Sequence, residues 1–336
     1  MPQSNRGEIL LFFTGGTICM RPRNGTDGVV PSGDFQHFLG EVSPHIHEVT
    51  LKPIIWADLP SPHMTPERMF CLAKDVESAL EAPEALGAVI IHGTDVLVES
   101  AFMADLVLKT TKPVIYTGSM RYYSELGYDG VRNLLNSVKA CLLPLPPDAG
   151  VILLMTDRLF AARDVIKVNA LNLNIDAFDA PESGPIGYIA GDDVVLNHCQ
   201  KNSSIPRPII QTDMLEENVP LLACYTGMDG SIVEYLRQHK KIAGLVIEGF
   251  GVGNIPPKLV PSLEVLVKEG IPVVLTTQCP QGGVWPIYDY PGGAMDLQKR
   301  GVILGGRISG AKARIQLMVL LGAKLSLASI RDIVVN

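Results

Sequence analysis

The chain has 336 residues, of which 47% are hydrophobic and 19% are charged, and its net charge is -7. This length is too great for one ordinary core and predicts two domains, and the negative charge disfavours nucleic acid or an anionic membrane as the main partner. The polar start of the chain and the short apolar run after it form neither a signal peptide nor a membrane span, so we expect a cytoplasmic protein.

Along the first half, short apolar runs of strand length alternate with segments whose apolar residues recur every three or four positions. The expected strands are Ile9–Phe13, Ala88–Ile91, Pro113–Tyr116 and Val151–Met155. The expected helices are Pro66–Leu80, Leu97–Lys109 and Val131–Leu142. This alternation is typical of a parallel sheet that helices cover on both faces, and it predicts an α/β fold.

A polar, proline-containing stretch from Asn197 to Asn218 lacks any sustained apolar period, and the α/β pattern resumes after it. The later strands are expected at Leu221–Tyr225, Leu245–Ile247 and Val273–Leu275, and the later helices at Ser231–His239, Pro261–Glu269 and Ser309–Leu321. We therefore expect a larger N-terminal catalytic α/β domain (residues 1–200), a linker (201–218) and a smaller C-terminal α/β domain (219–336).

The first expected strand runs directly into Thr14-Gly15-Gly16-Thr17. Ligands of open α/β sheets bind outside the carboxyl ends of strands, and paired glycines allow a tight turn and a close approach of the backbone to a ligand. Taken alone, the motif fits an ordinary turn or a phosphate loop as well as a catalytic loop.

Two more segments at strand ends carry reactive side chains. His92-Gly93-Thr94-Asp95 follows the strand Ala88–Ile91. Its backbone N–H groups could bind an anion, but Asp95 could equally be the N-cap of the next helix, and His92 is more often a packed histidine. The segment Arg163–Asn169, with Lys167, reads as a polar edge strand. No metal-ligand spacing, Walker loop or G-x-S-x-G motif occurs, so we expect neither a metal nor a cofactor.

Together these segments resemble the L-asparaginase family, the bacterial type I and type II enzymes. The motifs that carry the resemblance span nearly the whole chain: Thr14–Ile18, His92–Asp95, Thr117–Arg121, Tyr128–Gly130, Arg163–Asn169 and Gly251–Asn254. Ala177–Pro181 and Thr277–Gly282 are similar to the cytoplasmic type I branch. The resemblance implies hydrolysis of L-asparagine to L-aspartate and ammonia. It also implies a homo-oligomer, a tetramer built from close dimers, in which a neighbour's second domain completes each site.

The resemblance also assigns roles to individual residues. Thr14 matches the threonine that is acylated, and Thr94 matches a second threonine that forms a triad with Lys167 and Asp95. The substrate-binding residues it implies are Ser61 for the α-carboxylate, Asp95 for the α-ammonium, and Thr94, Gly15, Gly93 and Ser119 around the ligand.

The sequence departs from the family pattern at four places. The lid after the first strand, Met20–Ser32, has no tyrosine, whereas the family usually places one there against the first threonine. The missing phenol is either dispensed with or replaced by Thr26, Ser32, or Tyr288 or Tyr290 of another subunit. Ser61 is followed by Pro62-His63 rather than by a residue and then an aspartate, Asn254 is followed by Ile255-Pro256, and Trp285–Tyr290 is unusual.

An amide is unreactive, so hydrolysis needs a nucleophile, a base and donors for the oxyanion. Lys167 could accept a proton as a free amine, or it could remain an ammonium beside Asp95 and orient Thr94; which threonine attacks first is also open. Three alternatives remain: a hydrolase that prefers glutamine, an amidase subunit of a tRNA amidotransferase, and a pure binding protein. The amidotransferase subunit usually has an extra N-terminal domain, whereas here the first motif begins within fifteen residues, and the two retained threonines, Asp95 and Lys167 disfavour a binding protein.

Overall fold

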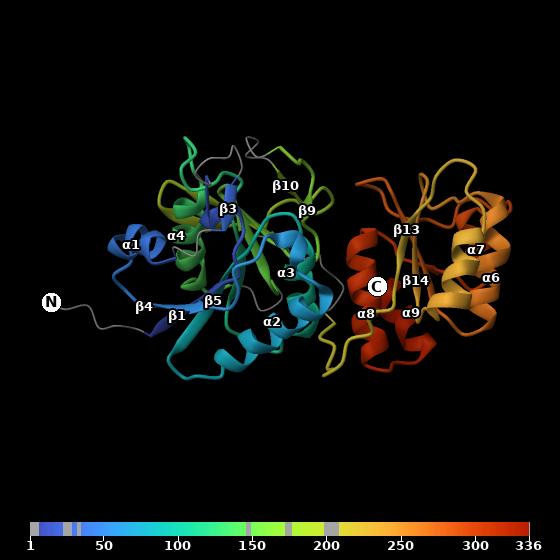
Figure 1. The fold of residues 1–336 in the computed structure, drawn as a ribbon, viewed down its shortest axis with the longest axis horizontal. Coiled ribbons are helices and arrows are strands. Elements are labelled where there is room, and N and C mark those ends of the chain that lie inside the picture. The colour runs from blue at the N-terminus through green and yellow to red at the C-terminus, as the bar shows by residue number, and fades with distance from the viewer. Residues whose placement is uncertain are drawn as a thin grey trace. The chain divides into compact units, whose positions relative to one another are not determined.

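The computed structural model describes residues 7–22, 29–31, 35–145, 149–171, 177–197 and 208–335. The chain forms two compact units, residues 1–209 and 210–336, and each is an α/β unit with its own sheet (Figure 1). The α/β fold expected from the sequence, with a larger, mostly parallel first sheet and a smaller second one, is confirmed. The expected linker, 201–218, falls partly on residues 201–207, which lie outside the described residues, and it stays a prediction.

Unit 1 contains an eight-stranded sheet in the order β12-β11-β8-β7-β6-β5-β1-β4. The strands are β1 (Glu8–Phe13), β4 (Thr50–Ile55), β5 (Ala85–Ile91), β6 (Val114–Thr117), β7 (Ile152–Met155), β8 (Arg158–Ala161), β11 (Gly187–Ala190) and β12 (Asp193–Leu196). The five strands from β4 to β7 run parallel, and the remaining pairings are antiparallel.

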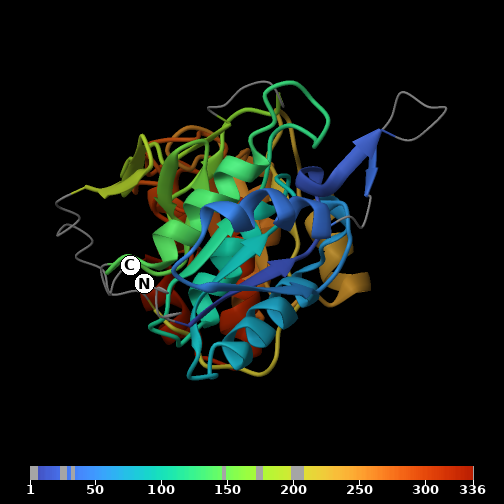
Figure 2. The same cartoon turned by 90° about the vertical axis from the view of Figure 1, so that its left-hand side faces the viewer.

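Helices cover both faces of this sheet because its central strands are apolar on both sides. In β1, Ile9, Leu11 and Phe13 belong to the core shared with α1 (Phe35–Val42) and α4 (Gly130–Cys141), which lie side by side in Figure 2. The alternate side chains Leu10 and Phe12 are buried on the opposite face, where α2 (Pro66–Ala79) and α3 (Leu97–Val107) pack against each other.

The expected strands and helices of unit 1 are present within a few residues of their predicted ends, but β4 and β12, the edge strands of the main sheet, were not expected. In β4 most side chains are at least partly exposed and Pro53 interrupts the run, as is typical of edge strands. Two short ribbons lie outside the main sheet: β2 (Met20–Pro22) with β3 (Val29–Pro31), which stands out from the unit in blue in Figure 2, and β9 (Ile166–Lys167) with β10 (Phe178–Asp179). Only two residues of the predicted edge strand at 163–169 are therefore in a strand.

Unit 2 is a four-stranded parallel sheet in the order β13-β14-β15-β16. Its strands are β13 (Leu221–Ala223), β14 (Leu245–Gly249), β15 (Val273–Thr277) and β16 (Ile303–Leu304). Its helices are α5 (Ser231–Tyr235, followed by a π-helical turn, Leu236–Lys240), α6 (Val260–Lys268), α7 (Ala294–Lys299), α8 (Gly310–Gly322) and α9 (Leu327–Val335). The short elements β16 and α7 were not expected from the sequence, nor was α9. None of the helices in the described ranges is long and apolar enough to cross a membrane.

The order of the strands determines where a ligand can bind in unit 1. From β1 the chain passes to β4 on one side, and it then continues with β5, β6 and β7 on the other side. This reversal places a topological switch point between β1 and β5, and the carboxyl ends of the strands beside such a point form the binding crevice of open α/β sheets.

Candidate active site

The loops that follow β1 and β5 leave the sheet side by side. Phe13 and Ile91, the last residues of the two strands, are register partners. The backbone N–H of Thr14 donates to the carbonyl of Ile91 at 3.0 Å, and that of His92 donates to Thr117 at 2.9 Å. The two threonine-containing motifs therefore start next to each other at the switch point.

Glycines let the two loops touch through their backbones. Gly16 has φ +92°, and a Cβ added to it would lie 2.3 Å from the Cα of Gly93. Gly15 has φ +102°, and a Cβ there would lie 2.4 Å from the backbone nitrogen of Leu59. A side chain at either position would be strained and would push the loops apart, so the paired glycines are needed for the packing of the site itself.

Lys167 lies between a hydroxyl and a carboxylate. Its Nζ donates to Thr94 Oγ1 at 3.2 Å and to Asp95 Oδ1 at 2.9 Å. The Lys167 side chain is 19% exposed and that of Asp95 is 59% exposed, so the lysine is largely shielded while the carboxylate faces solvent. The alternative that Asp95 caps the next helix is wrong, because the N-cap of α3 is Val96 and makes no side-chain cap hydrogen bond.

The hydroxyl of Thr14 has a different partner. It is 1% exposed and donates to the carbonyl oxygen of Ile91 at 3.1 Å. A backbone carbonyl cannot take up a proton, so Thr14 has to turn its hydroxyl away from Ile91 before it can act as a nucleophile. Its loop nevertheless borders that of Thr94 through the contact between Gly16 and Gly93.

Ser61 belongs to the same cluster. It opens a short 3₁₀ turn, Ser61–His63, and is 6% exposed. Its Oγ accepts a hydrogen bond from the backbone N–H of Asp95 at 3.1 Å. A hydroxyl that accepts in this way still has its own proton to donate, which suits a residue that would hold a carboxylate.

Ser119 lies in the loop Gly118–Arg121, and several groups of this loop donate hydrogen bonds to the carboxylate of Asp129. Asp129 accepts from the Ser119 hydroxyl at 2.8 Å and from the backbone N–H groups of Met120 and Arg121, both at 3.0 Å. The Ser119 hydroxyl also contacts the carbonyl of Arg121. Sequence reasoning gave Asp129 no role, although it lies in the Tyr128–Gly130 motif, which was the available signal.

His92 is a packed, neutral side chain. It is 1% exposed, its Nδ1 lies 2.8 Å from the carbonyl oxygen of Gly93, and burial lowers its pKa to about 4. The imidazole is therefore uncharged near pH 7 and can donate Nδ1–H to Gly93. This agrees with the prediction of a packed histidine at this position.

The base of the predicted lid contacts a tyrosine from another segment. The guanidinium of Arg21 lies 4.8 Å from the ring centroid of Tyr123, whose backbone N–H donates to Met20 at 3.3 Å. Thr26 and Ser32 lie outside the described residues. In unit 2, Tyr288 and Tyr290 are about half exposed, and their rings stack with centroids 5.5 Å apart.

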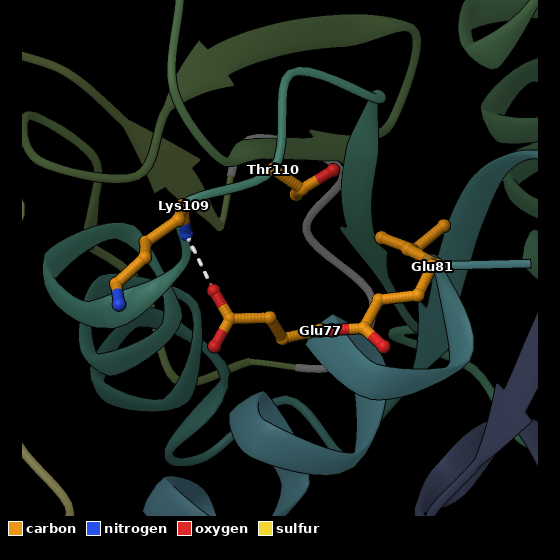
Figure 3. Close-up of a pocket in the computed structure, with 5 residues that line it drawn as sticks. Glu77, Glu81, Lys109 and Thr110 are labelled. Carbon is orange, nitrogen blue, oxygen red and sulfur yellow. Dashed lines mark hydrogen bonds between the residues drawn. The ribbon is translucent and has the colours of Figure 1, made fainter.

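A surface hollow lined by Glu77, Leu80, Glu81, Lys109 and Thr110 lies elsewhere in unit 1 (Figure 3). These residues end α2 and follow α3, just ahead of β5 and β6, so the hollow is at the amino ends of the strands. The backbone N–H of Lys109 donates to Glu77 across it at 2.8 Å. It contains no predicted site residue and lies at the wrong edge of the sheet for catalysis.

Within the described ranges, no group of three or more His, Cys, Asp or Glu side chains could hold a metal ion. The structure brings Thr94, Asp95, Lys167 and Ser61 together by hydrogen bonds. This arrangement can support acid–base chemistry at a hydroxyl next to a pair of glycine-rich loops.

Two family models match most of the chain. Residues 8–202 match the family described as "Asparaginase, N-terminal", and residues 218–334 match "Glutaminase/Asparaginase C-terminal domain". An L-asparaginase of Bacillus licheniformis is 32% identical over 317 residues, which cover 94% of this chain and 96% of that protein. The crystal structure of a probable cytoplasmic L-asparaginase from Campylobacter jejuni superposes with a TM-score of 0.84 at 27% identity and covers 98% of this chain and 99% of its own.

One subunit of the glutamyl-tRNA(Gln) amidotransferase of Pyrococcus abyssi is also similar, with 30% identity over 338 residues. The match covers 98% of this chain and 75% of that subunit. The chain is therefore similar both to L-asparaginases and to an amidotransferase subunit.

Proposed function

Because the chain belongs to the asparaginase family and is an amidohydrolase of that family, we propose that it hydrolyses the side-chain amide of L-asparagine through a threonine nucleophile and an acyl-enzyme intermediate. The observation that supports this most directly is the contact of Lys167 with both Thr94 and Asp95. In this contact a threonine hydroxyl, an amine and a carboxylate lie within hydrogen-bond distance at the expected end of the sheet.

In the proposed reaction, the oxygen of Thr14 attacks the amide carbon and gives up its proton to the Thr94–Lys167 pair. The C–N bond then breaks, the departing nitrogen takes a proton, and ammonia leaves an aspartyl ester on Thr14. Water attacks this ester, its C–O bond breaks, and L-aspartate is released as Thr14 regains a proton. Two steps replace one difficult step, which is the advantage of covalent catalysis.

A second assignment is supported by a specific contact. Thr94 Oγ1 lies 3.2 Å from Lys167, whereas the hydroxyl of Thr14 is engaged with the carbonyl of Ile91. In this version Thr94 attacks and Thr14 orients the substrate. Lys167 serves either scheme, as the acceptor of the proton or as an ammonium that orients the hydroxyl.

The substrate's two charged groups have matching partners in this proposal. Ser61 donates its free proton to the α-carboxylate, and Asp95, with its exposed side chain, pairs with the α-ammonium. The backbones of Gly15, Gly93 and Ser119 line the remaining sides. The backbone N–H of Asp95 donates to Ser61 Oγ, which keeps the two residues that would bind the substrate next to each other.

Ammonia release from L-asparagine, D-asparagine and L-glutamine by the purified protein tests this function. We expect the highest kcat/KM with L-asparagine. A higher value with L-glutamine would assign a glutaminase with the same site chemistry. No release from any of the three would overturn the proposal and favour a subunit that works only in an amidotransferase complex.

We also place the protein in the cytoplasm as a tetramer built from close dimers. The cytoplasmic description of the Campylobacter jejuni protein supports the location. Exposed aromatic side chains in unit 2, Trp285, Tyr288 and Tyr290, support the assembly, since aromatic side chains are enriched in interfaces. Light scattering with an activity assay on the same fraction tests it, and a fully active monomer would overturn it.

A further inference from the structure

Asn133 is a buried amide that joins three segments around the candidate site. It lies in the first turns of α4 and is 1% exposed. Its Nδ2 donates to the carbonyl of Gly118 at 3.0 Å and to Asp129 Oδ2 at 2.9 Å, and its Oδ1 accepts from the backbone N–H of Thr156 at 3.2 Å. The first contact holds the loop Gly118–Arg121 directly, the second orients the Asp129 carboxylate that binds this loop, and the third holds the turn between β7 and β8.

Only an asparagine-type amide satisfies all three partners at this position. The Gly118 carbonyl and the Asp129 carboxylate can only accept hydrogen bonds, and the Thr156 N–H can only donate. An aspartate would lack both donors and would put a second carboxylate beside Asp129, and an apolar side chain would leave buried polar groups without partners. The chemistry of the three partners therefore also fixes which end of the amide faces the loop.

The loop held by Asn133 lies directly against Thr94. A Cβ added to Gly118 would be 2.5 Å from the carbonyl oxygen of His92 and 3.4 Å from Cγ2 of Thr94. Because Gly118 has no side chain, its backbone can pass close to the methyl group of Thr94. The two groups on the Cβ of a threonine exchange places between staggered rotamers. In the described rotamer the methyl lies on the side of the Gly118 loop and Oγ1 bonds Lys167. A hydroxyl turned toward the loop would lose that hydrogen bond, so the position of the loop bears on which rotamer Thr94 adopts.

The third contact of Asn133, with the backbone N–H of Thr156, is made to the segment that precedes Lys167 in the chain. Thr156 and Asp157 have φ angles of +50° and +64° and form the two-residue turn between β7 and β8, a conformation that costs energy in residues other than glycine. The hydrogen bond from the Thr156 N–H to Asn133 stabilises this turn. The chain then runs through β8 (Arg158–Ala161) to β9, where Lys167 lies.

From these contacts we propose that Asn133 is a positioning residue for turnover: through Gly118 it holds Thr94 in the rotamer that Lys167 can reach, and Asp129 acts with it. The inference rests on the proposed function, because it assumes that the hydroxyl of Thr94 takes part in the reaction. It requires no contact between Asn133 and the substrate. The path from Asn133 to Lys167 runs through Gly118, the methyl of Thr94 and its hydroxyl.

A double-mutant cycle between Asn133 and Thr94 tests the inference. Asn133→Leu should lower kcat about 10- to 100-fold, the loss expected when a reacting group is misplaced by about an ångström. Serine has a hydroxyl but no methyl for Gly118 to hold. In the Thr94→Ser background, Asn133→Leu should therefore lower kcat less than about 3-fold, which makes the two changes strongly non-additive.

Asn136 provides a matched control in the same helix. It is 3% exposed, and its Nδ2 donates to Asp157 at 3.3 Å rather than to the loop beside Thr94. Asn136→Leu should destabilise the fold to a similar degree in a thermal melt, with kcat per folded molecule unchanged and additivity with Thr94→Ser. If Asn133→Leu does not fold, Asp129→Asn, which weakens the same loop contacts, replaces it in the cycle.

The outcomes separate this inference from the proposed function. If Thr94→Val keeps wild-type turnover, the proposed function of the triad is wrong. If Thr94→Val is inactive but Asn133→Leu lowers kcat equally with threonine and with serine at position 94, the proposed function stands and the positioning role is overturned. The same holds if Asn133→Leu leaves kcat unchanged.

Discussion

The loops after β1 and β5 are alike in structure but differ in chemistry. Both leave neighbouring parallel strands, they contact each other through Gly16 and Gly93, and each carries a buried threonine. The hydroxyl of Thr94 faces an amine at 3.2 Å, whereas that of Thr14 donates to a backbone carbonyl at 3.1 Å. In the described conformation, therefore, the Thr94 loop has the acid–base partner and the Thr14 loop does not.

A third threonine shows how to interpret the contact of Thr14. Thr117 ends β6 and donates to the carbonyl of Leu154 in the next strand at 2.8 Å, as Thr14 at the end of β1 donates to Ile91 of β5. Such a bond is thus a structural feature that recurs in this sheet. What distinguishes Thr14 is its place beside the glycine contact with the Thr94 loop.

Removing the amine gives the largest expected effect. Lys167→Met takes away the partner of the Thr94 hydroxyl, and the loss of a triad member lowers kcat by about 10³-fold or more. The fold should remain intact, because the Asp95 side chain left without its partner is 59% exposed and exposed ion pairs contribute little stability. Steady-state ammonia release and a thermal melt measure both quantities.

Lys112→Met is the matched control for this substitution. The Nζ of Lys112 donates to the carbonyls of Leu80 and Ala82 at 2.6 and 2.8 Å, at the end of α2. Its removal should lower the melting temperature and leave turnover unchanged. If Lys167→Met keeps more than a tenth of the wild-type turnover, the triad assignment is wrong.

The second prediction tests the other loop. Thr14→Val and Thr117→Val each remove one buried hydrogen bond to a carbonyl, so each should cost about 1 kcal/mol of unfolding free energy. Only Thr14→Val should also lower kcat, by about 100-fold or more if Thr14 is the nucleophile. Urea denaturation and kinetics on the two variants separate these effects.

The result for Thr14→Val also decides between the two threonines. If this variant retains substantial turnover while Thr94→Val is inactive, Thr94 is the nucleophile and the two roles must be exchanged. Equal activity losses in Thr14→Val and Thr117→Val would mean that the loss comes from removing a hydrogen bond at the end of a strand. Such a result would give no support to a special role for Thr14.

The central elements of the fold could be predicted from the sequence because their apolar patterns are determined by burial. The run Glu8–Phe13 is buried almost throughout, as a central parallel strand must be. The edge strand β4 has no such pattern, since only one of its faces packs on the unit. The short strands β8, β11 and β12 pair antiparallel and were likewise not expected.

The candidate site also has features that could be predicted from the sequence and features that could not. That Thr14 and His92–Asp95 lie next to each other could be predicted from their position after strands, because the carboxyl ends of parallel strands meet at one edge. The partnership of Lys167 with Thr94 spans 73 positions in the sequence, and only the family resemblance suggested it. The hydrogen bonds of Asn133 join positions 118, 129 and 156, and no local pattern of residues encodes such a junction.

The third prediction has the smallest effect on turnover and concerns the one titratable ring in the two loops. The imidazole of His92 is buried and neutral, and it donates from Nδ1 to Gly93 at 2.8 Å. The amide of an asparagine would keep a donor close to that position, so His92→Asn should leave kcat near pH 7 within a few-fold of wild type. The substitution should instead change how the stability of the protein depends on pH. The Thr14 loop has no titrating group and makes no such contribution.

The sign of that dependence follows from the direction of the pKa shift. Burial lowers the pKa of His92 from 6.5 to about 4, so between these pH values the unfolded chain binds a proton that the folded chain does not. The free energy of unfolding is therefore not reduced by His92 above pH 6.5, and it falls by about 3 kcal/mol as the pH is lowered toward 4. Urea midpoints of wild type and His92→Asn between pH 7 and 4 measure it, because all other titrating groups contribute to both proteins alike. The advantage of the wild type should shrink by this amount across the interval. A constant difference between the two proteins would mean that His92 can be protonated in the folded state, and the description of a neutral ring at the start of the Thr94 loop would then be wrong.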